Sequence, residues 1–194
     1  VDELIAQGRG REVLQALTSL PDQASQAAQR LLEYLLRPTT LHALLEQAGA
    51  DGDGLDLLQP FMSLDHYRTM LDTLATSDNR TLRRRLLTRL VHAPEALDPY
   101  IVSKLEDPRW FVQRNMLVLL EQTGRSPEGF AIGRWTSHQD VRVRHQAIRL
   151  QLATPGGRDA GVRATLLDGT PRLVHSGLAA LQQDCPAGLI ELVS

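Results

Sequence analysis

Residues 107–120 read DPRWFVQRNMLVLL, and this stretch decides the fold. It opens with a turn dipeptide, Asp107–Pro108, and continues with apolar residues at helical spacing. On a helical wheel with Val112 at zero, the apolar residues cluster toward the core, whereas Arg114 falls at about 200° and points away from it. Asn115 falls at about 300°, on the margin of the core face. The stretch therefore predicts a helix with one buried face, and we expect Arg114 and Asn115 to lie outside that face.

The same pattern recurs three more times along the chain. The related stretches are SDNRTLRRRLLTRL from Ser77, HQDVRVRHQAIRLQL from His138 and DGTPRLVHSGLAAL from Asp168. When they are aligned on Leu82, Val112, Val143 and Leu173, the offsets between neighbours are 30, 31 and 30 residues. A second set of helical stretches lies between them. A period near thirty predicts stacked helix pairs at about 64–91, 94–123, 126–153 and 156–183, because one pair cannot bury its apolar stripe alone.

The composition favours helices over strands. Hydrophobic residues make up 42% of the 194 residues, but aromatic residues only 4%, and strands favour aromatic and β-branched side chains. Residues 1–63 are less regular, and we expect them to form degenerate N-terminal repeats or a cap. Residues 64–194 are expected to form one continuous solenoid. The whole chain is thus expected to be all-α, with about 10–12 helices of antiparallel pairs.

The repeat resembles the HEAT family, in which a turn Asp is followed five residues later by Val or Leu, then by Arg and a small residue. The residues that carry the resemblance are Asp107 with Val112, and His138 with Val143, Arg144 and Ala147. The resemblance covers about residues 64–185. This part of the chain is also similar to bacterial HEAT-type domains with an "RW…RN…LL" core repeat. The resemblance implies a right-handed, armadillo-like superhelix. In the family, Asp and Arg of neighbouring repeats form a hydrogen-bonded ladder, which is expected to be incomplete here because Gln113 and Val174 stand at the Arg position.

Charge is distributed unevenly along the chain. Residues 1–78 carry 5 Arg and no Lys against 12 Asp and Glu, a balance of −7. Residues 79–194 carry 16 Lys and Arg against 11 acidic residues, a balance of +5. A basic second part can contact an anionic partner, although an ordinary mixed surface has the same composition.

The exposed helix face carries basic residues in every repeat. The position of Arg114 is occupied by Arg84, His145 and His175 in the other repeats, that of Phe111 by Thr81, Arg142 and Arg172, and that of Val118 by Thr88, Arg149 and Ala179. Such a column lines the concave side of a solenoid and can hold an acidic peptide, a phosphate or a nucleic-acid backbone. The expected binding residues are Arg84, Phe111, Arg114, Arg142, His145 and Arg149. Trp110 and Trp135 are expected to pack rather than to bind.

The pattern indicates a non-enzymatic scaffold that binds a protein or an acidic peptide. The alternative is binding to a nucleic-acid backbone, since some bacterial alkylpurine DNA glycosylases are HEAT-like and use a catalytic Asp flanked by Trp. Here Trp110 follows Arg109, and Asp140 lies in the next turn, so that arrangement is not matched. Binding to nucleic acid would weaken steeply with salt.

No catalytic, metal-binding or cofactor motif is present in the sequence. The single cysteine, Cys185, has no nearby His and excludes an internal disulfide, which is typical of a reducing, cytoplasmic location. No apolar run reaches the roughly 18 residues of a membrane span. The chain begins without Met and ends in GLIELVS, which reads as an unfinished helix, so we expect a fragment of a larger protein.

Overall fold

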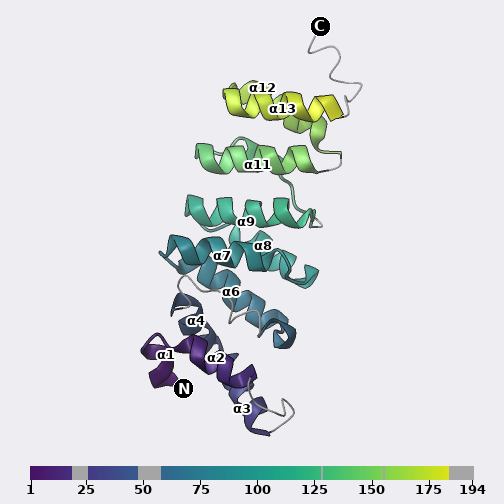
Figure 1. The fold of residues 1–194 in the computed structure, drawn as a ribbon. Coiled ribbons are helices and arrows are strands. Elements are labelled where there is room, and N and C mark those ends of the chain that lie inside the picture. The colour runs from purple at the N-terminus through teal and green to yellow at the C-terminus, as the bar shows by residue number, and fades with distance from the viewer. Residues whose placement is uncertain (19–25, 48–57, 128, 155, 184–194) are drawn as a thin grey trace. The chain divides into compact units, whose positions relative to one another are not determined.

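The computed structural model describes residues 1–18, 26–47, 58–127, 129–154 and 156–183. These residues form twelve α-helices and two short 3-10 helices, and no strand occurs among them (Figure 1). The prediction of an all-α protein is confirmed. The chain divides into two compact units, Val1–Leu97 and Asp98–Ser194.

The first unit is built around a long central helix, α6 (Leu64–Thr76), which packs against α4 (Pro38–Gln47), α7 (Arg80–Leu90) and the 3-10 helix η2 (Glu95–Leu97). The remaining elements are α1 (Asp2–Ala6), α2 (Gly10–Thr18), α3 (Gln26–Leu35) and the 3-10 helix η1 (Gln59–Phe61). Leucines from these helices dominate the core, among them Leu35, Leu41, Leu71, Leu74 and Leu86. Each contributes roughly 1.5–3 kcal/mol of hydrophobic stabilisation when fully buried.

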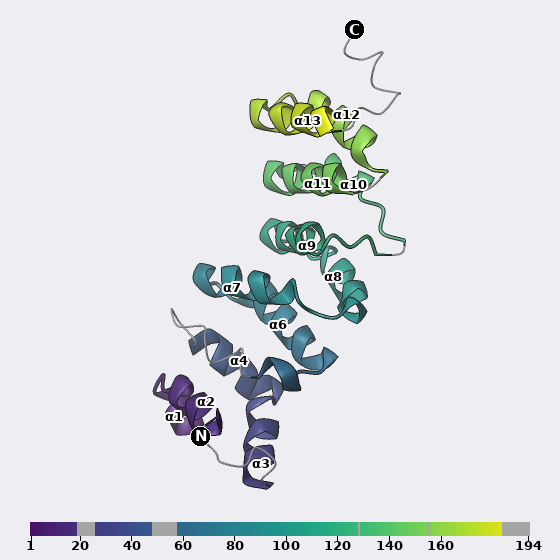
Figure 2. The ribbon, with the colours of Figure 1, turned by 45° about the vertical axis from the view of Figure 1, so that its right-hand side comes forward.

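The second unit contains α8 (Asp98–Lys104), α9 (Trp110–Thr123), α10 (Gly133–Thr136), α11 (Val141–Ala153), α12 (Arg158–Asp168) and α13 (Pro171–Gln183). Helix α9 packs against α8 and α11, and α11 packs in turn against α10, α12 and α13. Figures 1 and 2 show α9, α11 and α13 as successive layers of this unit. The residues of the aligned columns form its core, among them Val112, Met116, Leu117, Val143, Ala147 and Ile148.

Several helices begin at a side chain that accepts hydrogen bonds from the first turn or end at a glycine. Asn79 precedes α7 and accepts hydrogen bonds from the backbone N–H groups of Thr81 and Leu82. Asp140 accepts one from Arg142 at the start of α11. These side chains satisfy donors that the first helical turn leaves without a partner. At the other end, α9 stops at Gly124, whose φ of 64° lies in the left-handed region that glycine adopts without strain.

The helices between residues 64 and 183 start and end within a few residues of the expected ones, with one marked difference. A helix was expected to begin near Ser126, but α10 has only four residues, Gly133–Thr136. Phe130 N–H instead donates to the Pro127 carbonyl in a turn, and Gly129 has a φ of 74°. A left-handed residue at this point interrupts any helix from Pro127 onward. The division into a cap at 1–63 and a solenoid at 64–194 stays a prediction.

Helices α12 and α13 approach each other closely at Gly177. Gly177 occupies the core column position that Met116 and Ala147 fill in the preceding repeats. A Cβ atom at Gly177 would lie 2.3 Å from the hydroxyl oxygen of Thr165, which is itself fully buried. The absence of a side chain at Gly177 therefore allows these two helices to approach closely.

Candidate functional site

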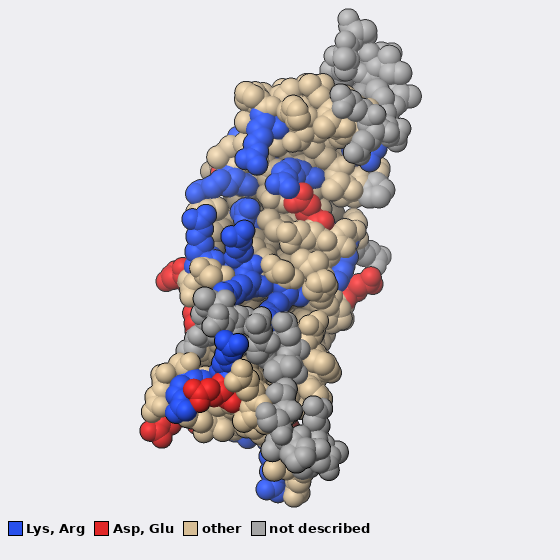
Figure 3. All heavy atoms as spheres, in the orientation of Figure 1, with Lys and Arg blue, Asp and Glu red and all other residues tan. Residues whose placement is uncertain are grey.

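Basic side chains from α9, α11 and α13 surround one hollow on the second unit, which we call the arginine hollow. Its volume is about 540 Å³. It is lined by Arg114, Arg142, His145, Gln146, Arg149, Arg172, Leu173 and Ser176. Figure 3 shows Lys and Arg side chains gathered on the face of the unit formed by these helices. The structure therefore brings four of the expected binding residues together, namely Arg114, Arg142, His145 and Arg149.

Arg114 and Asn115 are coupled to each other. Asn115 is only 5% exposed, so the prediction that it lies unburied on the helix margin is wrong. Its side-chain oxygen accepts a hydrogen bond from Arg114 Nη1 at 3.3 Å. Arg114 is half-buried; this burial lowers its pKa, the nearby charge of Arg149 lowers it further, and Glu121 opposes both. Arg114 is thus a partly desolvated cation, and an additional anion beside it would be favourable.

Glu121 brings an acidic group to the edge of the hollow. Its carboxylate pairs with Arg149 Nη2 at 3.1 Å and accepts a hydrogen bond from the side chain of Gln146, which is buried. The aligned columns contain no acidic residue, and Glu121 was missed for that reason. The helical wheel could have found it, because Glu121 falls at about 180°, next to Arg114.

Arg142 is held in place from two sides. Its Nε and Nη2 atoms donate to the two carboxylate oxygens of Asp140 at 3.0 and 2.6 Å. Its guanidinium carbon lies 3.3 Å from the centre of the Trp110 ring, a cation–π contact. The hydrogen bonds from Arg142 lower the pKa of Asp140 to about 2. Arg142 is therefore held in one orientation by contacts within the second unit.

The two tryptophans differ in environment. Trp135 is buried and stacks on His138, so its expected packing role is confirmed. Trp110 is 36% exposed, so its expected packing is only partial, and it reaches the next repeat through Arg142. It contacts Arg142 across its face and the half-buried Phe111 in an edge-on geometry, with ring centres 6.1 Å apart. Phe111 thus lies beside the hollow rather than among its lining residues.

His145 belongs to a polar cluster that links α11 to the start of α13. Its Nε2 atom lies 3.3 Å from Asp168, which also pairs with Arg144 at 2.7 Å. Asp168 also accepts a hydrogen bond from the Thr170 hydroxyl. Burial raises the pKa of Asp168, but Thr170, Arg144 and His145 together outweigh burial and hold it at about 2.

In three of the four repeats, the residue that follows the first core residue is polar and has a common use. Arg83 donates to the backbone carbonyl of Ser77, Arg144 to that of His138, and Gln113 to that of Leu105. Each side chain thereby ties its helix to the preceding connection. Arg144 also reaches the turn Asp of the next repeat, whereas Gln113 is too short and uncharged to form an ion pair.

Arg172 of the hollow and the predicted binding residue Arg84 have no acidic neighbour among the described residues. Arg172 is exposed at the start of α13, and no acidic side chain of the described residues lies within ion-pair distance of it. The same is true of Arg84, which is exposed on α7 in the first unit and is not part of the hollow. Arg84 shares its helix with Arg80, Arg83, Arg85 and Arg89.

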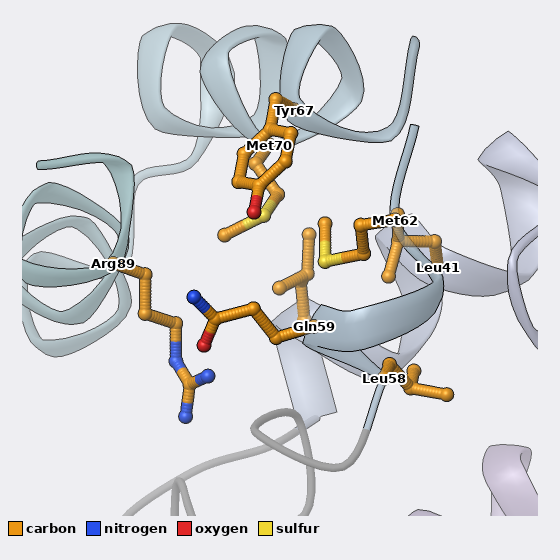
Figure 4. A pocket seen from close by; sticks show the side chains of 8 residues that line it. Leu41, Leu58, Gln59, Met62, Tyr67, Met70 and Arg89 are labelled. Carbon is orange, nitrogen blue, oxygen red and sulfur yellow. The ribbon is translucent and has the colours of Figure 1, made fainter. Parts of the chain in front are cut away.

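The first unit has a small apolar pocket between α4, η1 and α6. Figure 4 shows Met62, Tyr67 and Met70 around this space, with Gln59 and Arg89 at one side. Its volume is about 10 Å³. Because a single water molecule needs roughly 10–15 Å³, this pocket cannot hold an organic ligand without rearrangement.

The described residues give little support to chemistry of another kind. They contain no group of three or more His, Cys, Asp or Glu side chains placed to hold a metal ion. Cys185 lies outside them. In the part of the chain that the structure covers, no helix has both the length and the apolar character needed to cross a bilayer. Asp140 is engaged by Arg142, and Arg142 also covers one face of Trp110, so these residues do not form an open acid flanked by tryptophans.

No protein-family model, curated protein or solved structure matches this chain. The candidate function therefore rests on the geometry and charge of the hollow itself.

Proposed function

We propose that this chain is a HEAT-like solenoid module whose arginine hollow binds an acidic segment of a protein partner, without catalysing a reaction. The solenoid proposal is supported by the offsets of 30, 31 and 30 residues and by the layered arrangement of α9, α11 and α13 (Figure 1). The ion pair between Arg144 and Asp168 supports it further, because it joins the Arg position of one repeat to the turn Asp of the next.

One observation carries the binding proposal: the hollow is lined by four arginines and a histidine, and by no acidic residue. Glu121 and Asp140 at its edge pair with Arg149 and Arg142. Arg114 and Arg172 have no such partner within ion-pair distance among the described residues. An incoming carboxylate would complete the coordination of both, and charge-assisted hydrogen bonds of this kind contribute roughly 1.5–3 kcal/mol each.

Preorganisation favours the same ligand. Arg142 is fixed by Asp140 and Trp110, and Arg149 by Glu121. Ordering a long side chain on binding costs roughly 0.5–1.5 kcal/mol, and this cost is reduced where the side chain is already held. Arginine and tryptophan are also the residue types that dominate protein–protein contacts.

Binding to a nucleic-acid backbone is the second candidate, favoured by the exposed Trp110 beside Arg142. A base can stack on such an aromatic face while arginines hold the phosphates. The two candidates differ in salt dependence, because a protein that neutralises several phosphates releases condensed counterions and loses affinity steeply as salt rises.

The proposal can be tested by fluorescence anisotropy with a labelled Glu-rich peptide and a labelled DNA duplex, each titrated at several salt concentrations. The double variant Arg114→Ala/Arg172→Ala should reduce peptide affinity at least about 10-fold, since a factor of 10 corresponds to only about 1.4 kcal/mol. The matched control is Arg134→Ala/Arg163→Ala, which removes the same charge from exposed arginines of the second unit outside the hollow. Equal affinities of the two double variants would contradict the proposal. Tighter, strongly salt-dependent binding of the duplex would favour the nucleic-acid candidate.

A further inference from the structure

His145 is the lining residue of the arginine hollow whose charge can change near neutral pH. The ionisable side chains of the lining are one histidine and four arginines, namely His145, Arg114, Arg142, Arg149 and Arg172. Arginine keeps its positive charge in proteins, whereas an imidazole ordinarily gains a proton between pH 8 and pH 5. The total charge of the hollow therefore depends on pH through His145.

The carboxylate of Asp168 holds His145 at the wall of the hollow. His145 Nε2 lies 3.3 Å from Asp168 Oδ1 and 3.4 Å from the Thr170 hydroxyl oxygen. Asp168 is buried, and its pKa of about 2 keeps it ionised at neutral pH. Its other oxygen, Oδ2, accepts a hydrogen bond from Arg144 Nε at 2.7 Å. The His145 side chain is 28% exposed, so solvent can supply a proton, and the N–H group of the protonated ring has an acceptor in place.

Charges of both signs surround His145 on the elements that pack against α11. They are Arg114 and Glu121 of α9, Arg142, Arg144 and Arg149 of α11 itself, Asp168 at the end of α12 and Arg172 of α13. Among the described residues, α10 contributes nothing to the lining. The arginines of the hollow oppose a further positive charge, and Asp168 attracts it. An anion that enters the hollow offsets the arginines and so favours the protonated ring.

The other two histidines of the second unit, His138 and His175, lie outside the lining. His138 stacks on Trp135, and its Nδ1 accepts a hydrogen bond from the backbone N–H of Asp140 at 3.0 Å. A proton on that nitrogen would remove the hydrogen bond. His175 is exposed on α13. Of the three, His145 is thus the one placed to meet a ligand of the hollow.

We propose, on the basis of the function proposed above, that protonation of His145 strengthens binding of the acidic segment, so that the arginine hollow responds to pH. The coupling is reciprocal: a bound carboxylate favours the protonated imidazole, and the protonated imidazole favours the carboxylate. Binding therefore takes up protons. Affinity is highest at pH values where His145 is protonated, and it declines as the pH rises through the range in which the imidazole loses its proton.

Fluorescence anisotropy with the labelled Glu-rich peptide at pH 8, 7 and 6 and constant ionic strength tests this dependence. The peptide stays ionised over this range, because glutamate has an ordinary pKa of about 4.3. We expect the native chain to bind at least about threefold more tightly at pH 6 than at pH 8, since half a pKa unit of coupling suffices for that factor. His145→Gln keeps an N–H group that can donate to Asp168, and it should bind equally at both pH values. The control His175→Gln should keep the native pH dependence.

Calorimetry gives a second readout, which a purely structural role of His145 would not change. Titrations in two buffers of different ionisation enthalpy measure the protons taken up on binding. Near pH 7, the native chain should take up a fraction of a proton per bound peptide, and His145→Gln should take up measurably less. Because the native chain alone gives the first value, an uptake of zero contradicts the proposal even if the variant does not fold.

The outcomes separate the pH response from the binding on which it rests. Equal native affinity at pH 8 and pH 6, or a pH dependence that persists in His145→Gln, would overturn the proton coupling and leave acidic-segment binding intact. Failure of the peptide to bind at any pH, or binding that Arg114→Ala/Arg172→Ala does not weaken, would overturn both. Circular dichroism at each pH checks that the helices of every variant are retained.

Discussion

Replacement of Asp168 by Asn should destabilise the second unit in a way that depends on pH. The Asp168 side chain is only 3% exposed and meets Arg144, His145 and Thr170. Its pKa is lowered from 3.8 to about 2, against the effect of burial. One pKa unit corresponds to about 1.4 kcal/mol, so the carboxylate contributes on the order of 2 kcal/mol to the stability of the folded state.

The sign of the pH effect follows from the lowered pKa. A carboxylate with a lower pKa in the folded state stabilises it fully above the unfolded-state pKa near 3.8, and this contribution is lost as the pH falls through about 2. At pH 7, Asp168→Asn should therefore be less stable than the native chain by on the order of 2 kcal/mol. Between pH 7 and pH 2, the variant should lose less stability than the native chain by the same amount.

Urea unfolding followed by tryptophan fluorescence measures this effect in the relevant unit. Both tryptophans of the chain, Trp110 and Trp135, lie in the second unit. Glu106→Gln is a suitable control, because it neutralises a carboxylate of the same unit whose side chain is 66% exposed. If Asp168→Asn unfolds at the same urea concentration as the native chain at pH 7, the stabilising role assigned to the polar cluster is refuted. Asp107 and Asp140, whose pKa values are also about 2, keep part of the acid sensitivity in the variant.

Three further substitutions test the packing and capping of the two units. Arg125→Ala should destabilise the second unit by about 2–3 kcal/mol in the same fluorescence assay, because it removes the 2.9 Å ion pair of the buried Asp98 carboxylate. Gly177→Ala should cost about 1–3 kcal/mol, since the new methyl group would collide with Thr165. Asn79→Ala should cost about 1 kcal/mol through loss of the helix cap, measured by circular dichroism because the first unit contains no tryptophan.

Conservative replacements at the same positions give the corresponding controls. Arg125→Lys keeps the charge and should recover part of the lost stability, and Asn79→Ser keeps a capping oxygen and should be nearly neutral. An Arg125→Ala or Gly177→Ala variant as stable as the native chain would show that the described contact does not contribute.

The positions of the helices could be predicted from the sequence more accurately than the burial and contacts of the polar residues on them. The offsets near thirty residues placed the main helices correctly, because buried columns such as Val112, Met116 and Leu117 repeat at fixed spacing. The wheel put Asn115 at the margin of the core face, but a single-helix projection does not contain the neighbouring layer. Helix α11 packs against α9, and both Asn115 and Val118 are buried in the structure.

Contacts between repeats were harder to predict than those within one helix. Glu121 stands on the same face as Arg114 but outside the aligned columns, so alignment alone does not identify its pairing with Arg149. The stack of Arg142 on Trp110 joins two layers and depends on side-chain conformations that no periodicity describes. The short α10 was missed because a left-handed conformation at Gly129 cannot be told from an ordinary loop glycine in one sequence.

The carboxylate of Glu121 has a consequence for selectivity. It competes with any ligand for Arg149, because a ligand gains affinity at that position only if it binds Arg149 more strongly than Glu121 does. A singly charged metabolite offers no advantage over a group that is already tethered there at high local concentration. A chain with several negative charges can displace the Glu121 carboxylate, because it would contact Arg114 and Arg172 at the same time. Under the proposed function, the hollow would therefore favour a long acidic segment over small anions.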